Sequence, residues 1–152
     1  GMEQRIELAG LRPREEIAKR LAQTDCFVLA SESETFGVSY LEALSCGVPV
    51  IATRCGGPEC FVNEHNGIMV ETGNVDALAR AMLTIYCNID FYNRPAIAQE
   101  VRRVYSSQAV ARSLIRQYEN LLDSRETQLE KEAVCRENLH ILLYFLPVRG
   151  LS

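Results

Sequence analysis

SESETFGVSYLEALSCGVPV, residues 31–50, connects two apolar runs of strand length through a segment with helical spacing. The first run, CFVLA, covers residues 26–30, and the second, VPVIAT, covers residues 48–53. Between them, apolar side chains recur on one side of a helix and a glycine follows as a stop signal. These residues are Val38, Leu41, Leu44 and Gly47. A strand, a helix and a second strand in this order predict a βαβ unit.

The rest of the chain continues the alternation of strands and helices. Further strands are predicted at residues 5–10 and 66–70. Further helices are predicted at residues 13–25, 74–87, 95–105 and 107–123, the second of them capped by Asn74. Strands that are almost wholly apolar are typical of a parallel sheet covered on both faces. We therefore expect an α/β fold, a Rossmann-like parallel sheet of about four strands flanked by helices.

The number of strands also bears on domain organisation. A chain of 152 residues suits one domain. A complete doubly wound domain usually has more strands than the four expected here, so the sequence predicts part of one. We expect this partial domain at residues 5–123 and a charged, helix-prone C-terminal extension at residues 124–152.

Charge and composition narrow the class of protein. The formal net charge is −4 and the pI is near 5.3, which gives no basic surface for nucleic acid or an anionic membrane. No signal peptide is recognised, and the apolar run ILLYFL is far shorter than the ~20 residues that span a bilayer. We expect a cytoplasmic protein that does not bind nucleic acid.

Cysteine and histidine are arranged unlike the ligands of a zinc site. The six cysteines form no CxxC pair, and only His65 and His140 are present. Free thiols in a reducing compartment are the expected state of the cysteines. Both histidines are expected to be solvated or structural.

Two loops are predicted to share the ligand-binding edge of the sheet. Residues 31–37, SESETFG, follow one strand, and residues 54–59, RCGGPE, follow another. In an open parallel sheet, ligands bind beyond the carboxyl ends of the strands. Each loop leads into a helix and would present backbone N–H groups there, which favours a phosphate or sugar oxygen. Because the helix dipole alone is a modest device, a cation would be needed as well.

Glu34 and Glu42 raise the possibility of paired catalytic acids. Eight helical positions separate two residues by up to ~12 Å along the axis, whereas the carboxyl groups of glycosidases stand ~5–9.5 Å apart. The spacing fits better with two acceptors that hold different parts of one elongated, hydroxyl-bearing ligand. Two plainer interpretations stay open: Glu34 as a residue that complements the helix dipole, and Gly56-Gly57 as a simple turn.

The residues of this region resemble the C-terminal, donor-binding domain of family-4 retaining glycosyltransferases of the GT-B fold. The resemblance rests on the E-x7-E element of Glu34 and Glu42, the E-T-F-G step from Glu34, and the E-A-x-x-C-G-x-P-V run from Glu42. A Gly-Gly turn with an acid two residues on, and the Asn66-Gly67 pair before a strand, also match. The resemblance covers about residues 5–122.

The resemblance implies a role for each matching residue. Glu34 would face the hydroxyls of the donor sugar and is the candidate catalytic residue, and Glu42 would accept hydrogen bonds from the nucleotide ribose. The remaining donor-binding candidates are Ser33, Phe36, Gly37, Val38, Gly56 and Gly57. The reaction would transfer a hexose from a nucleotide diphosphate sugar to an acceptor, with retention of the anomeric configuration. Neither a metal nor another cofactor is expected, because cationic side chains and helix dipoles would stabilise the leaving diphosphate.

The resemblance also implies partners that these residues do not supply. The Arg/Lys pair that holds the diphosphate in the family lies upstream of the matching region, and Arg54 and Arg12 do not match it. An N-terminal acceptor-binding domain is expected in the parent protein, and membrane contact only through that domain. The 152-residue chain alone is expected to bind donor weakly and to catalyse little. Two alternatives remain: a non-catalytic nucleotide-sugar-binding module derived from such an enzyme, and a GT-B nucleotide-sugar epimerase.

Overall fold

The structure is a computed structural model that describes the backbone of residues 3–144 and the side chains of residues 3–125. The chain divides into two units, one ending at Ser106 and one beginning at Ser107. Each unit is described by itself.

A three-stranded parallel sheet forms the centre of the first unit. The strands are β1 (Phe27–Leu29), β2 (Val50–Thr53) and β3 (Gly67–Val70), in the order β1-β2-β3. Ile51 lies opposite Val28 of β1 on one side and Ile68 of β3 on the other. Every residue of β2 is buried, as expected for a central strand covered on both faces. The predicted α/β class with a parallel sheet is confirmed.

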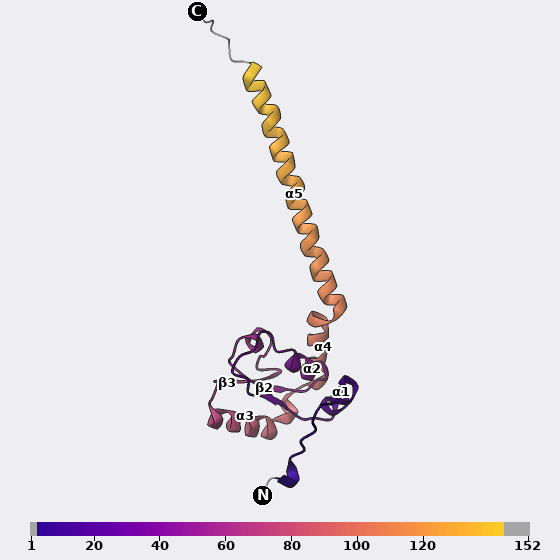
Figure 1. The fold of residues 1–152 in the computed structure, drawn as a ribbon, viewed down its shortest axis with the longest axis vertical. Helices are drawn as coiled ribbons and strands as arrows, with labels where there is room; N and C mark the ends of the chain where they lie inside the picture. The colour runs from indigo at the N-terminus through magenta and orange to yellow at the C-terminus, as the bar shows by residue number, and fades with distance from the viewer. Residues whose placement is uncertain (1–2, 145–152) are drawn as a thin grey trace, which may run out of the picture. The chain divides into compact units, whose positions relative to one another are not determined.

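Helices cover both faces of this sheet. Figure 1 shows α2 and α3 on opposite sides of it. The α-helices of the unit are α1 (Arg14–Ala22), α2 (Val38–Ser45), α3 (Val75–Cys87) and α4 (Arg94–Tyr105). Short 3-10 helices lie at Glu3–Arg5, Gly57–Cys60 and Ile89–Phe91. The Asn74 side chain caps α3 by accepting a hydrogen bond from the Ala77 amide at 2.9 Å, as predicted.

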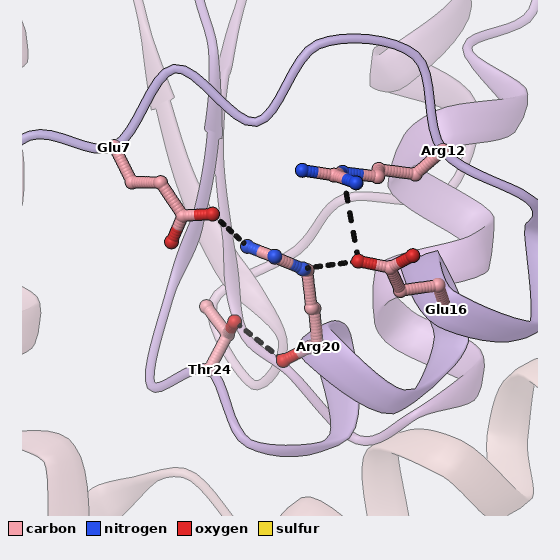
Figure 2. A network of polar contacts seen from close by, with 5 residues as sticks. All are labelled: Glu7, Arg12, Glu16, Arg20 and Thr24. Atoms are coloured by element: carbon pink, nitrogen blue, oxygen red, sulfur yellow. Dashed lines mark hydrogen bonds and ion pairs between the residues drawn. The ribbon is translucent and has the colours of Figure 1, made fainter.

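The strand predicted at residues 5–10 is wrong. Arg5 ends a short 3-10 helix, residues 6–10 have no regular structure, and Leu8 is 93% exposed. Instead, an ion pair connects the segment to α1: Glu7 contacts Arg20 at 2.9 Å, and Arg20 also contacts Glu16 of the same helix at 3.3 Å (Figure 2). Alternating apolar residues form a strand only beside a partner strand, and the part of the chain that the structure describes offers these residues none.

The core is centred on α2 and β2. Its largest fully buried side chains include Tyr40, Leu44, Ile51 and Ile85. The predicted buried face of α2 is wrong in one respect, because Val38 is 59% exposed. The helix instead turns Tyr40, Ala43 and Leu44 inward, at the i, i+3, i+4 spacing of one helix face. Tyr40 takes the place that the sequence pattern gave to Val38.

Replacing Tyr40 with phenylalanine is expected to lower the free energy of unfolding by about 1–2 kcal/mol. The Tyr40 hydroxyl donates a hydrogen bond to the Leu29 carbonyl oxygen at 2.6 Å, and the side chain is 0% exposed. Urea denaturation measures the change. Tyr86→Phe is the matched control, because Tyr86 is 81% exposed. Equal midpoints for the two variants would contradict a stabilising role for the buried hydroxyl.

The second unit is a single long helix, α5 (Ser107–Tyr144). The helix predicted at residues 107–123 and the helix-prone segment that follows it are continuous, so the backbone does not break at position 124. The division of domains at residues 123 and 124 stays a prediction. Within residues 3–144, none of the helices has the length and apolar composition needed to cross a membrane.

Candidate functional site

The two loops predicted to form the site are joined by backbone hydrogen bonds. The Glu34 amide donates to the Cys55 carbonyl oxygen at 3.1 Å, and the Gly57 amide donates to the Glu34 carbonyl oxygen at 2.9 Å. These bonds form an isolated parallel bridge between Glu34 and Gly56 beyond the ends of β1 and β2. The loops therefore extend the parallel pairing of the sheet and lie at one edge, as predicted.

Two buried side chains hydrogen-bond the backbone at the end of β1 and at the start of the first loop. Thr53 donates from its hydroxyl to the Ser31 carbonyl oxygen at 2.5 Å. Tyr40 anchors the end of β1 through its bond to Leu29. Burial, with smaller effects of nearby Cys55 and Glu34, raises the pKa of Tyr40 to about 12, so the phenol stays a neutral donor at physiological pH.

Glu34 is held at this edge with its carboxylate partly buried. The Ser31 hydroxyl donates to Oε1 of Glu34 at 2.9 Å. The neighbouring residue Ser33 is exposed. The Glu34 backbone is held by its bonds to Cys55 and Gly57, and the bond from Ser31 holds one oxygen of its side chain. The carboxylate therefore has a defined position.

Gly37 begins α2 in a left-handed conformation, with φ of 87°. A Cβ atom at this position would lie 2.8 Å from the Tyr40 ring, so only glycine fits without a shift. Unlike the asparagines that cap α3 and α4, Gly37 has no side chain to cap the helix. The first turn of α2 also contains no acidic residue. The positive end of this helix is thus not neutralised by its own side chains.

Phe36 lies beside this helix start and is 41% exposed. The ring packs edge-on against Phe61 and Tyr105, with centroids 5.7 and 6.0 Å apart. These contacts hold the loop backbone that leads into Gly37.

The amides of Gly56 and Gly57 are engaged within the protein. The Gly56 amide donates to its neighbour Glu59, whose two carboxylate oxygens lie 3.0 and 3.2 Å away. A Cβ atom on Gly57 would lie 2.4 Å from the carbonyl carbon and oxygen of Phe36. The Gly-Gly turn therefore permits close approach of the two loops, in addition to any contact with a ligand.

Glu42 lies further along α2, beside a surface cavity of about 460 Å³. Its side chain is 40% exposed, so the carboxylate lies outside the core. It accepts a hydrogen bond from Arg14 of α1, with Nη2 and Oε1 3.1 Å apart. The cavity lies between the two helices and is lined by Arg14, Glu15, Ile17, Ala18, Leu21, Glu42, Ser45 and Cys46.

The two cations considered from the sequence are paired with other acids. Arg54 contacts Glu71 at 3.2 Å, and Arg12 contacts Glu16 at 3.5 Å. The sequence alone does not single out Arg14, because no local pattern connects it with a glutamate 28 positions away.

The described side chains of residues 3–125 include neither a disulfide nor a cluster of metal ligands. The cysteines with described side chains are all free thiols. Burial, and to a smaller extent Asp25, raises the pKa of Cys26 to about 11. Among the side chains of residues 3–125, no three His, Cys, Asp or Glu residues gather in a group that could hold a metal ion. His65 is exposed, whereas His140 lies outside the described side chains.

Comparison with known proteins identifies sequences similar to this one. Residues 1–88 match the family described as "Glycosyl transferases group 1". The N-acetyl-alpha-D-glucosaminyl L-malate synthase of Bacillus anthracis is 30% identical over 73% of this chain and 29% of its own length. The D-inositol 3-phosphate glycosyltransferase of Corynebacterium urealyticum is 32% identical over 80% of this chain and 29% of its own. The chain thus spans less than a third of the length of these relatives.

Solved structures show the same fold. The sucrose-phosphate synthase of Thermosynechococcus elongatus superposes with a TM-score of 0.71 and 25% identity, over 81% of this chain and 32% of the other. Anabaena HepE in complex with UDP superposes with a TM-score of 0.64 and 26% identity, over 76% of this chain and 34% of the other.

Proposed function

The chain belongs to the group 1 glycosyl transferases, and on that premise we propose that it is the donor-binding part of a retaining hexosyltransferase. The parent enzyme transfers a hexose from a nucleotide diphosphate sugar to an acceptor hydroxyl. The bond between the anomeric carbon and the diphosphate oxygen breaks, and a bond to the acceptor oxygen forms on the same face of the sugar. The nucleoside diphosphate leaves, and the proton of the acceptor hydroxyl passes to it. Retention is part of the proposal because the E-x7-E element resembles that of retaining enzymes.

The observation that carries the proposal is the bridge between Glu34 and Gly56. It places the Glu34 carboxylate and the uncapped start of α2 at one edge of the sheet. A carboxylate that accepts sugar hydroxyls and a positive helix end that attracts a diphosphate are the two groups that such a donor requires. The UDP-bound relative with this fold supports a nucleotide at the site.

Each part of the donor has a counterpart among these residues. The hexose hydroxyls bind Glu34, and the diphosphate contacts the amides around Phe36, Gly37 and Val38. The ribose binds Glu42, whose carboxylate faces the cavity between α1 and α2. Developing negative charge on the diphosphate is stabilised by the helix end and by cationic side chains, without a metal ion.

The remaining features of the enzyme extend beyond these residues. The chain spans about a third of the length of its solved relatives. We propose that an N-terminal domain of the parent protein binds the acceptor, that any membrane contact is made through that domain, and that the protein is cytoplasmic.

Titration of the isotope-labelled chain with UDP-glucose and GDP-mannose tests the proposed site. We expect NMR shift changes at residues 31–42 and 54–59, because both loops and the first two turns of α2 contact the donor. Shift changes confined to α3 or α4 would contradict the placement. Uridine and free glucose serve as partial ligands that separate the nucleoside and sugar ends of the site.

A transfer assay on the intact parent protein separates the enzyme from a binding module. A product whose anomeric carbon has the same configuration as in the donor sugar supports a retaining transferase. Donor binding at the two loops without any transfer, with a range of acceptors, would favour the non-catalytic module instead.

A further inference from the structure

The contact between Arg14 and Glu42 has a consequence for which nucleotides the site accepts. The guanidinium of Arg14 bonds Oε1 of Glu42, and no other side chain in residues 3–125 bonds this carboxylate. The side chain of Arg14 is 86% exposed, and that of Glu42 is 40% exposed. The ion pair is therefore accessible to a ligand and can open without disturbing the core.

The cavity beside this ion pair has the chemistry of a nucleoside site. Ile17, Ala18 and Leu21 of α1 give it an apolar wall, and Glu42 contributes a hydrogen-bond acceptor. Glu15 adds a second carboxylate, which disfavours a phosphate inside the cavity. A flat base against the apolar wall, with its sugar hydroxyls at Glu42, is compatible with this lining.

We propose that Arg14 is a specificity-determining residue that competes with the ribose for Glu42. The inference rests on the proposed function, since it requires a nucleotide at Glu42. A carboxylate binds the two neighbouring hydroxyls of ribose best with both of its oxygens. Arg14 already donates to one of these oxygens in the free protein, so the ribose competes with the guanidinium for the acceptor sites and the space at Oε1. A deoxyribose has a single hydroxyl and binds the other oxygen without displacing Arg14.

The size of the effect follows from the exposure of the pair. An exposed ion pair contributes at most about 1 kcal/mol, which corresponds to about a fivefold change in an equilibrium constant. Arg14 therefore lowers the preference for ribose over deoxyribose by up to about fivefold, and its removal restores that preference.

The experiment compares UDP with 2′-deoxy-UDP in the wild-type chain and in Arg14→Gln. Dissociation constants come from NMR titration, and the ratio of the two constants is the readout. Loss of a positive charge weakens the binding of both anionic ligands alike, so this effect cancels in the ratio of the two dissociation constants. We expect the preference for UDP over 2′-deoxy-UDP to rise about two- to fivefold in Arg14→Gln.

The matched control is Arg20→Gln, which removes the same charge from α1. Arg20 contacts Glu7 and Glu16 rather than Glu42 (Figure 2). The ratio of the two dissociation constants in Arg20→Gln should therefore equal that of the wild type. An unchanged or lower ratio in Arg14→Gln, or an equal rise in Arg20→Gln, overturns the role of Arg14 while the nucleotide site stands. Absence of UDP-dependent shifts at residues 31–42 and 54–59 in the wild type instead overturns the proposed function, and the inference with it.

Discussion

Replacing Glu42 with alanine is expected to weaken binding of UDP by at least about tenfold. A hydrogen bond to a charged acceptor contributes about 1.5–3 kcal/mol, and partial exposure of Glu42 places the effect near the lower end of that range. The helix itself should survive, because alanine favours helices and, within residues 3–125, the exposed Arg14 is the one side chain that bonds the Glu42 carboxylate. NMR titration gives the dissociation constant, and thermal unfolding followed by circular dichroism verifies the fold.

Glu100→Ala is the control for this substitution. Glu100 lies exposed on α4 and its replacement changes the net charge by the same amount. The affinity of Glu100→Ala for UDP should match that of the wild type. If Glu42→Ala bound UDP as tightly as Glu100→Ala, the ribose would have to be held elsewhere, and the assignment of Glu42 would fail.

Replacing Gly57 with alanine is expected to disrupt both loops of the site at once. The added Cβ would lie 2.4 Å from the Phe36 carbonyl group, and a backbone cannot yield as a flexible side chain does. The loops must separate, which breaks the bond from the Gly57 amide to Glu34. Overpacking of this kind costs about 1–3 kcal/mol. We expect a lower urea midpoint together with loss of UDP-dependent shifts at residues 31–37.

Gly73→Ala separates this effect from the general cost of replacing a glycine. A Cβ at Gly73 meets no atom within 4 Å, and only its φ of 75° is unfavourable for alanine. This variant should lose about 1–2 kcal/mol and keep its response to UDP. The signals of α3 report whether Gly57→Ala still folds. A Gly57→Ala variant with wild-type stability and UDP shifts would show that the loops do not require their close approach.

The parts of the fold that depend on local pattern could be predicted from the sequence. Continuous apolar runs gave β1 and β2, since a strand covered on both faces needs apolar side chains at every position. Asn74 was recognisable as a cap because the side chain that bonds the helix start lies within the same few residues.

The errors arose where distant residues decide the outcome. Residues 5–10 have the alternation of a strand, but alternation does not supply a neighbouring strand. Val38 was expected in the core because tyrosine is not counted in an apolar stripe, although Tyr40 buries its ring and gives its hydroxyl a partner in Leu29.

The candidate site shows the same division. The positions of Glu34 and Glu42 on a loop and a helix followed from the sequence. The ion pair with Arg14 did not, because it depends on how α1 packs against α2.

The bridge between Glu34 and Gly56 limits how this site can be redesigned. Residues 31–37 and 54–59 are 17 or more positions apart in the chain, yet each supplies backbone partners for the other. If only one segment were replaced by that of a relative, its backbone would not match the hydrogen-bonding groups of the other, original segment. Loop transplantation intended to change the proposed donor specificity therefore requires that residues 31–37 and 54–59 be exchanged together.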